Sequence, residues 1–97
     1  MIKMLVLNIP PELEEDLIDY LLSLESVTGF TSYETRGHGS DVTLSIAEQV
    51  SGRRKRLRFE LVIEGEEIQS LLDGLSTEVG KDIAYWEQAI ENIGHIT

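Results

Sequence analysis

Hydrophobic and polar positions recur along this chain with two different periods, one typical of strands and one typical of helices. Residues 4–9, MLVLNI, are largely apolar on both faces of an extended chain, which predicts a strand in the middle of a sheet. The stretch 11–25 instead carries apolar residues at helical spacing, and it predicts a helix with Pro11 at its first position. The apolar stripe of this helix consists of Leu13, Leu17, Leu21 and Leu24.

The second half of the chain repeats these periods. Residues 30–36 are rich in Thr, Tyr and Phe but have no strongly apolar face, so they predict an edge strand. Residues 54–63 alternate clearly between apolar and polar, which predicts another strand. A second helix is predicted over 66–79 with Gly80 at its end, and a last strand over 82–87. The core-facing residues of the third strand are Leu57, Phe59, Leu61 and Ile63.

This order of elements predicts an α+β protein with the ferredoxin-like βαββαβ fold, in which a four-stranded antiparallel sheet carries two helices on one face. All 97 residues fit a single domain. The strands at 4–9 and 54–63 are expected in the centre of the sheet. Its bare face would carry Val6, Ala84 and Trp86. Because apolar residues on an uncovered sheet face are incomplete in a monomer, we expect a closed homo-oligomer.

Two segments fit none of these elements. Residues 39–52 form a polar excursion that is long for a hairpin, and we expect it to be mobile and functional; an unstructured connection is the alternative. Within it, Ser45 and Glu48 match a capping box, which predicts a short helical turn over 46–50. The tail, 88–97, is too aliphatic to stay free, so we expect it to dock on this domain or on a partner. Its aliphatic residues are Ala89, Ile90, Ile93 and Ile96.

The formal net charge of −10 narrows the function classes. Phosphate repulsion over most of the surface disfavours nucleic-acid binding. The absence of cysteine excludes disulfides and cysteine-based zinc sites. No apolar run resembles a signal peptide or approaches the roughly 20 residues that span a bilayer, so we expect a cytoplasmic protein without direct membrane insertion. Five of the eight Lys and Arg residues lie between Arg53 and Arg58, which indicates an anionic ligand or the acids of a neighbouring subunit.

The alternation of the third strand places Arg54, Arg56 and Arg58 on one face of the sheet. One interpretation is that they pair with Glu34, Glu60 or acids of another subunit, as most charge stripes do. The other is that they contact an anion.

Candidate catalytic or metal chemistry is sparse. His38 lies between two glycines, and an ordinary pKa of about 6.5 suits a pH-dependent or metal contact. His95 lies in a second Gly-His pair, but histidines this far apart form no local metal motif, so exposed or structural histidines are the alternative. The carboxylates at the start of the first helix are better explained by the helix dipole than by a metal. Without cysteine or a recognisable nucleophilic serine, we expect no enzyme and no cofactor.

Three stretches resemble the PII-like signalling proteins, and more closely a small bacterial family of unknown function that is grouped with them. They are VLNIPPELEEDLIDYLL, GFTSYETRGHG and AEQVSGRRKRLRFE, and the resemblance covers nearly the whole chain. It implies a homotrimer that binds small effectors in clefts between subunits, with 37–39 at the cleft. It also places 39–52 where such proteins carry the T-loop, which engages partners such as membrane transporters. The junction 79–82 is too short for the phosphate loop of PII proteins, so a triphosphate site of that kind is not expected.

The leading hypothesis is therefore a non-enzymatic regulatory protein that binds a small anionic effector and docks a partner, such as a transporter, through 39–52. A second hypothesis is a metal-responsive or metal-binding accessory protein linked to heavy-metal efflux, as the resemblance suggests, using His38 with His95 or carboxylates. A third is a structural interaction module without a ligand. The ligand-binding residues predicted by the leading hypothesis are Gly37, His38, Gly39, Arg53, Arg54 and Lys55. Its predicted partner-binding residues are Ser45, Ile46, Glu48, Gln49 and Val50.

Overall fold

The computed structural model describes residues 1–38 and 54–97, and Arg54 is described as a backbone position of a strand only. Several sequence predictions concern the segment between these ranges: the ligand contacts at Gly39 and Arg53, the helical turn at 46–50, and the partner loop at 39–52. They lie outside the described residues and stay predictions.

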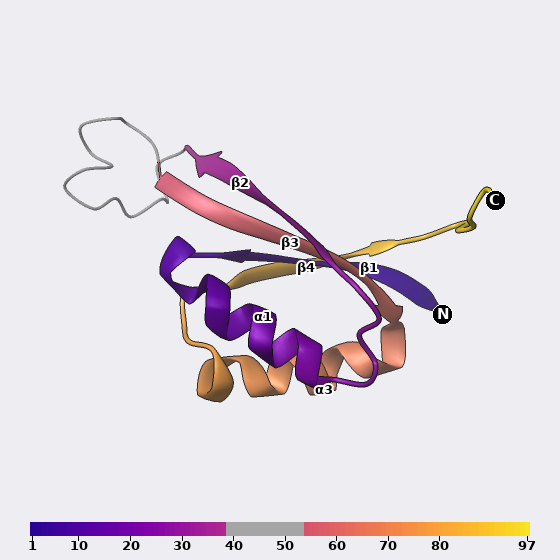
Figure 1. The fold of residues 1–97 in the computed structure, drawn as a ribbon, viewed down its shortest axis with the longest axis horizontal. Coiled ribbons are helices and arrows are strands. Elements are labelled where there is room, and N and C mark those ends of the chain that lie inside the picture. The colour runs from indigo at the N-terminus through magenta and orange to yellow at the C-terminus, as the bar shows by residue number, and fades with distance from the viewer. Residues whose placement is uncertain (39–53) are drawn as a thin grey trace.

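The described part of the chain forms one antiparallel sheet of four strands in the order β2-β3-β1-β4. Both helices cover the same face of that sheet (Figure 1). This arrangement confirms the predicted ferredoxin-like fold, with the two most apolar strands in the centre. The elements are β1 (Ile2–Ile9), η1 (Pro11–Leu13), α1 (Glu14–Ser23), β2 (Thr31–Gly37), β3 (Arg54–Glu64), α3 (Gly65–Glu78) and β4 (Ala84–Ala89).

The hydrophobic core lies between the sheet and the helices, because alternate residues of the two central strands face the helix layer. The register of β1 and β3 pairs Leu5 with Leu61 and Leu7 with Phe59. These four side chains are at most 2% exposed, and full burial of such a side chain stabilises a fold by about 1.5–3 kcal/mol. The helices complete the core with Leu17, Leu21, Ile68, Leu71 and Leu75.

The two helices approach each other closely at a glycine. The hydroxyl of Tyr20 in α1 donates a hydrogen bond of 2.8 Å to the backbone oxygen of Leu71 in α3. A Cβ at Gly74 would collide with that hydroxyl, so this glycine, which weakens a helix by propensity alone, makes the contact possible. Burial, and then the nearby carboxylates of Glu78 and Asp73, raise the pKa of Tyr20 above its usual value.

Several element boundaries differ from the sequence predictions; β1, for example, begins at Ile2 rather than at residue 4. The helix expected over 11–25 begins as a 3₁₀ turn and its α-helical part ends at Ser23. The last strand, expected over 82–87, begins only at Ala84 and ends at Ala89. Its start is delayed because Asp82 has a φ of 65°, which no extended strand contains.

The segment after β4 runs away from the domain, at the end of the molecule that also carries the N-terminus (Figure 1). Ile93 is 54% exposed and Ile96 is 97% exposed. Ala89, the first aliphatic residue of the predicted tail, belongs to β4 and pairs with Lys3 of β1, so the tail begins on its own domain, whereas Ile93 and Ile96 are not part of the hydrophobic core. Docking on a partner stays a prediction.

Candidate functional site

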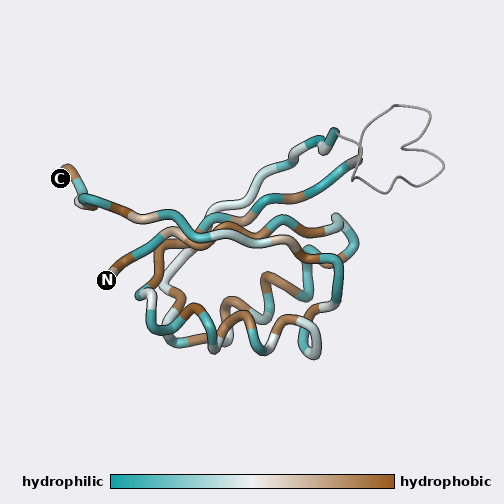
Figure 2. Tube along the Cα trace, turned by 180° about the vertical axis from the view of Figure 1, so that it is seen from behind, coloured by the Kyte–Doolittle hydropathy of each residue, from teal (hydrophilic) through white to brown (hydrophobic). Residues whose placement is uncertain are grey.

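Beyond the body of the sheet, β2 and β3 continue as a two-stranded ribbon. The pairing of β1 with β3 ends at Ile9 and Leu57, whereas β2 stays paired with β3 as far as Gly37 and Arg54. The ribbon therefore projects past the helix layer (Figure 1). Its outer end is hydrophilic, as the teal colour in Figure 2 shows, in contrast to the apolar centre of the sheet.

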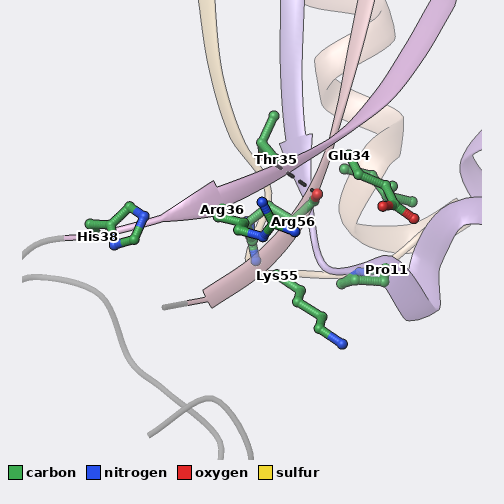
Figure 3. A pocket seen from close by; sticks show the side chains of 8 residues that line it. Pro11, Glu34, Thr35, Arg36, His38, Lys55 and Arg56 are labelled. Carbon is green, nitrogen blue, oxygen red and sulfur yellow. Dashed lines mark hydrogen bonds between the residues drawn. The ribbon is translucent and has the colours of Figure 1, made fainter. Parts of the chain in front are cut away.

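An open hollow of about 600 Å³ lies along the ribbon, beside the start of η1. Among its described lining residues, Arg36, Lys55 and the buried Arg56 are cationic, His38 is ionisable, and Glu34 supplies the one carboxylate. These charged side chains come from both strands of the ribbon (Figure 3). In a chain with a net charge of −10, this cluster of cations gives the hollow a locally positive character. The complete described lining is Pro11, Glu34, Thr35, Arg36, His38, Lys55, Arg56 and Leu57.

The structure brings some of the predicted ligand-binding residues together and not others. His38 and Lys55 both line the hollow and are exposed to solvent. Gly37 lies next to His38 in β2 but is not part of the lining. Arg54 occupies the position opposite Gly37 in the ribbon. The strand pairing thus brings Gly37 and His38 close to the start of β3, and their role in binding a ligand stays a prediction.

Arg56 lies on the same sheet face as Arg58, as predicted, but its guanidinium is buried within its own chain. Arg56 is 6% exposed. Its Nε donates a hydrogen bond of 2.6 Å to Oδ1 of Asn8, and one Nη donates to the Asn8 backbone oxygen at 2.9 Å. The two Nη atoms also donate to the Asp82 backbone oxygen at 2.7 Å and to its carboxylate at 3.1 Å. We call this set of contacts the Arg56 clasp; it joins β3, β1 and the turn before β4.

Arg58, the next arginine of the stripe, has a different environment. Its guanidinium carbon lies 5.0 Å from the ring centroid of Trp86, a cation–π contact that reaches across β1 to β4. Pairing of the stripe with Glu34 or Glu60 of the same chain, one of the expected interpretations, is wrong for Arg56, whose carboxylate partner is Asp82. Glu60 instead accepts a hydrogen bond of 2.6 Å from the Tyr33 hydroxyl.

The two histidines lie far apart. His38 follows β2 at the outer end of the ribbon, whereas His95 belongs to the tail, and Figure 1 shows these segments at opposite ends of the molecule. A site using both would need two copies of the chain. Over residues 1–38 and 54–97, no group of three or more His, Asp or Glu side chains is arranged to hold a metal ion. In the same part of the chain, no helix is long and apolar enough to cross a membrane.

The sequence of this chain matches one known protein family over nearly its whole length. Residues 2–97 match the family model described as "Protein of unknown function (DUF3240)". The chain belongs to this DUF3240 family. A crystal structure of a DUF3240 family protein from Shewanella baltica OS155 is similar in fold, with a TM-score of 0.80 and 23% sequence identity, and the match covers 99% of this chain and 97% of that one. No curated protein matches the chain.

Sequence reasoning missed part of the hollow in this DUF3240 chain. Arg36 and Glu34 share a strand face with His38, so the alternation of β2 could have identified them as neighbours of the Gly-His-Gly turn. Pro11 gave no such signal, because it belongs to η1 and reaches the hollow only through the packing of η1 beside the ribbon. The role of Asp82 in the Arg56 clasp had no signal either, since it depends on a turn with positive φ.

Proposed function

We propose that this DUF3240 protein is a non-enzymatic regulatory protein of the PII-like type, which binds a small anionic effector and transmits its presence to a partner protein. The observation that carries the proposal is the hollow on the β2–β3 ribbon, where Arg36, His38 and Lys55 gather in an otherwise acidic chain. Guanidinium and ammonium groups bind carboxylate or phosphate groups through charge-assisted hydrogen bonds.

The position of the hollow links effector binding to the segment 39–52. His38 directly precedes this segment, and Lys55 lies only three positions after its last residue. A ligand held by both residues therefore constrains both ends of the segment, and it favours those conformations of the segment that bind it best. In the proposed mechanism, the partner, such as a membrane transporter, reads that conformation through the side chains of Ser45, Ile46, Glu48, Gln49 and Val50.

The proposed protein acts as a homo-oligomer, with a trimer as the expected state. The face of the sheet opposite the helices supports this, because Trp86 and Tyr33 are 37% and 40% exposed on it. Single exposed aromatic residues are common, but several on an uncovered sheet face indicate a surface that binds another protein.

The effector proposal is tested by thermal unfolding of the full chain with bicarbonate, phosphate, and adenosine mono-, di- and triphosphate in turn. A ligand that binds the native state raises the unfolding temperature. For any compound that does so, calorimetry with Lys55→Ala and His38→Ala should show affinity lowered roughly tenfold or more, since a charge-assisted contact contributes about 1.5–3 kcal/mol.

The matched control is Lys3→Ala. Lys3 is also a surface lysine, but its Nζ pairs with Glu87 at 3.1 Å and it lies at the opposite end of β1 from the hollow. Affinity that falls equally in the control and in the two site variants would reflect net charge alone and would remove the hollow as the site. No response to any of these anions would argue against an anionic effector.

A further inference from the structure

The sheet face without helices carries a cation and an anion close together among aromatic side chains. The strand register places Tyr33, Arg58 and Asn8 in one row across the sheet, and Glu60, Val6 and Trp86 in the next. Side chains in these rows share a face because residues two apart along a strand point the same way. We call this surface the open sheet face.

Arg58 is unusually placed for an arginine on this face. The side chain is half-buried, and its Nε atom is buried without any hydrogen-bond partner. Among the residues that the structure describes, the Arg58 side chain forms no hydrogen bond or ion pair, and its guanidinium stacks over Trp86. A buried polar atom without a hydrogen-bond partner lowers stability, so an acceptor from another molecule at this Nε would be favourable.

Glu60, an anion on the same sheet face, lacks a cationic partner in the part of the chain that the structure describes. It is two residues from Arg58 on β3, yet the two side chains lean in opposite directions. Arg58 reaches over β1 to Trp86, whereas Glu60 accepts its hydrogen bond from Tyr33 on β2. Within the described residues, Glu60 has a neutral hydroxyl as its partner and no cation. The open sheet face therefore carries a cation, Arg58, and an anion, Glu60, that do not pair with each other.

We propose that the open sheet face binds a second copy of this chain, with Arg58 of each copy paired to Glu60 of the neighbouring copy. Charge complementarity supports a copy as the occupant, because one surface carries both members of the pair and can satisfy them reciprocally in a closed assembly. Trp86 and Tyr33 flank the pair and would exclude water from it, which strengthens a charge-assisted bond.

The overall charge of the chain favours an ion pair at the contact between copies. Two copies, each with a net charge of −10, repel one another, so a general apolar contact would be opposed electrostatically. A desolvated Arg–Glu pair on the contact surface fixes the register and offsets that repulsion locally. This inference rests on the self-association in the proposed function, and it is independent of the effector hollow.

The test uses charge reversal and is read by sedimentation equilibrium of the full chain. Arg58→Glu and Glu60→Arg should each weaken association roughly thirtyfold or more, as expected when one partner of a buried charge pair is lost. The double variant, Arg58→Glu with Glu60→Arg, should recover association, because the exchanged charges again meet across the contact. Trp86 is the single tryptophan of the chain, so a blue shift of its fluorescence with concentration gives a second readout.

Control variants distinguish the loss of the Arg58–Glu60 pair from a change in net charge. Lys81→Glu and Glu67→Arg change the charge by the same amounts at exposed positions outside the open sheet face, and both should leave association unchanged. If a reversed variant fails to fold, Arg58→Met keeps the apolar stem over Trp86 and removes only the charge, and it should weaken association as well.

The outcomes distinguish the inference from the proposed function. Association that is unaffected by Arg58→Glu or Arg58→Met, or that is not restored in the folded double variant, would overturn the pairing while leaving self-association intact. A parent protein that is monomeric at micromolar concentration would overturn self-association as well. Anion binding by the hollow is measured separately, so neither result decides it.

Discussion

Gly80 occupies a position where a side chain would disturb two elements at once. Its backbone has a φ of 155°, which other residues rarely adopt, and its N–H donates a hydrogen bond of 2.9 Å to the Leu75 backbone oxygen. A Cβ at this position would lie 2.9 Å from Cδ2 of Leu13 in η1. Gly80 therefore ends α3 and also leaves room for the turn that precedes α1.

We expect Gly80→Ala to lower the free energy of unfolding by about 1–3 kcal/mol, through backbone strain and overpacking against Leu13. Urea denaturation followed by far-ultraviolet circular dichroism measures the change. The matched control is Gly29→Ala, where a Cβ would meet no atom within 4 Å. The control should be neutral or stabilising by up to about 1 kcal/mol, since alanine restricts the unfolded chain. Equal losses in the two variants would contradict this account of Gly80.

Among the elements, the Arg56 clasp holds three segments in place with one side chain. It satisfies the carbonyl groups of Asn8 at the end of β1 and of Asp82 before β4, and it anchors the start of the ribbon on β3. A guanidinium suits this task because its rigid fork donates in several directions in one plane, whereas the ammonium of lysine is a single point of charge.

Replacing Arg56 by methionine should reduce stability by about 2–3 kcal/mol, because several charge-assisted hydrogen bonds are lost. The loss is smaller than for a fully buried pair, since the Asp82 side chain is 57% exposed and water can solvate it. The same exchange at exposed Arg36, on the neighbouring strand, should change stability by less than about 0.5 kcal/mol. Thermal unfolding of both variants checks this; similar losses would mean that the clasp adds little.

The elements could be predicted from the sequence wherever a strong period continued to the end of the element. Leu57 to Ile63 alternate without interruption, so β3 and its buried face were evident. The start of β4 could not be predicted, because the turn with positive φ at Asp82, which contacts the distant Arg56, has no local signal. The same holds for the hollow: His38 and Lys55 were predicted from the Gly-His-Gly sequence and the basic run, whereas Pro11 reaches the hollow through tertiary packing.

At the scale of the whole molecule, two aromatic residues on opposite faces of β4 can be compared as possible contacts between copies. Trp86 lies on the open sheet face, whereas Tyr85, its neighbour in sequence, points to the other side and is 54% exposed. Both are aromatic residues of one strand, so the same substitution at each changes charge and size in similar ways. Only the first is expected to lie in the contact between copies.

Trp86→Asp should therefore convert the assembly to monomers, because it removes a large apolar contact and adds a negative charge to an already acidic surface. Tyr85→Asp should leave the assembly intact. Light scattering coupled to size-exclusion chromatography gives the mass of each variant. An unchanged oligomer for Trp86→Asp would place the contact on another surface of the protein.

The ribbon of β2 and β3 has a mechanical consequence. We expect the ribbon to bend where β1 stops at Ile9, because beyond that point only two strands resist bending. Arg56 lies one residue beyond this point on β3. Its guanidinium donates hydrogen bonds to Asp82, which lies just before β4. A protein that pulls on the far end of the ribbon would thus move the edge strand carrying Trp86. We expect this displacement to leave the hydrophobic core unchanged, because Arg56 and Asp82 are not part of it.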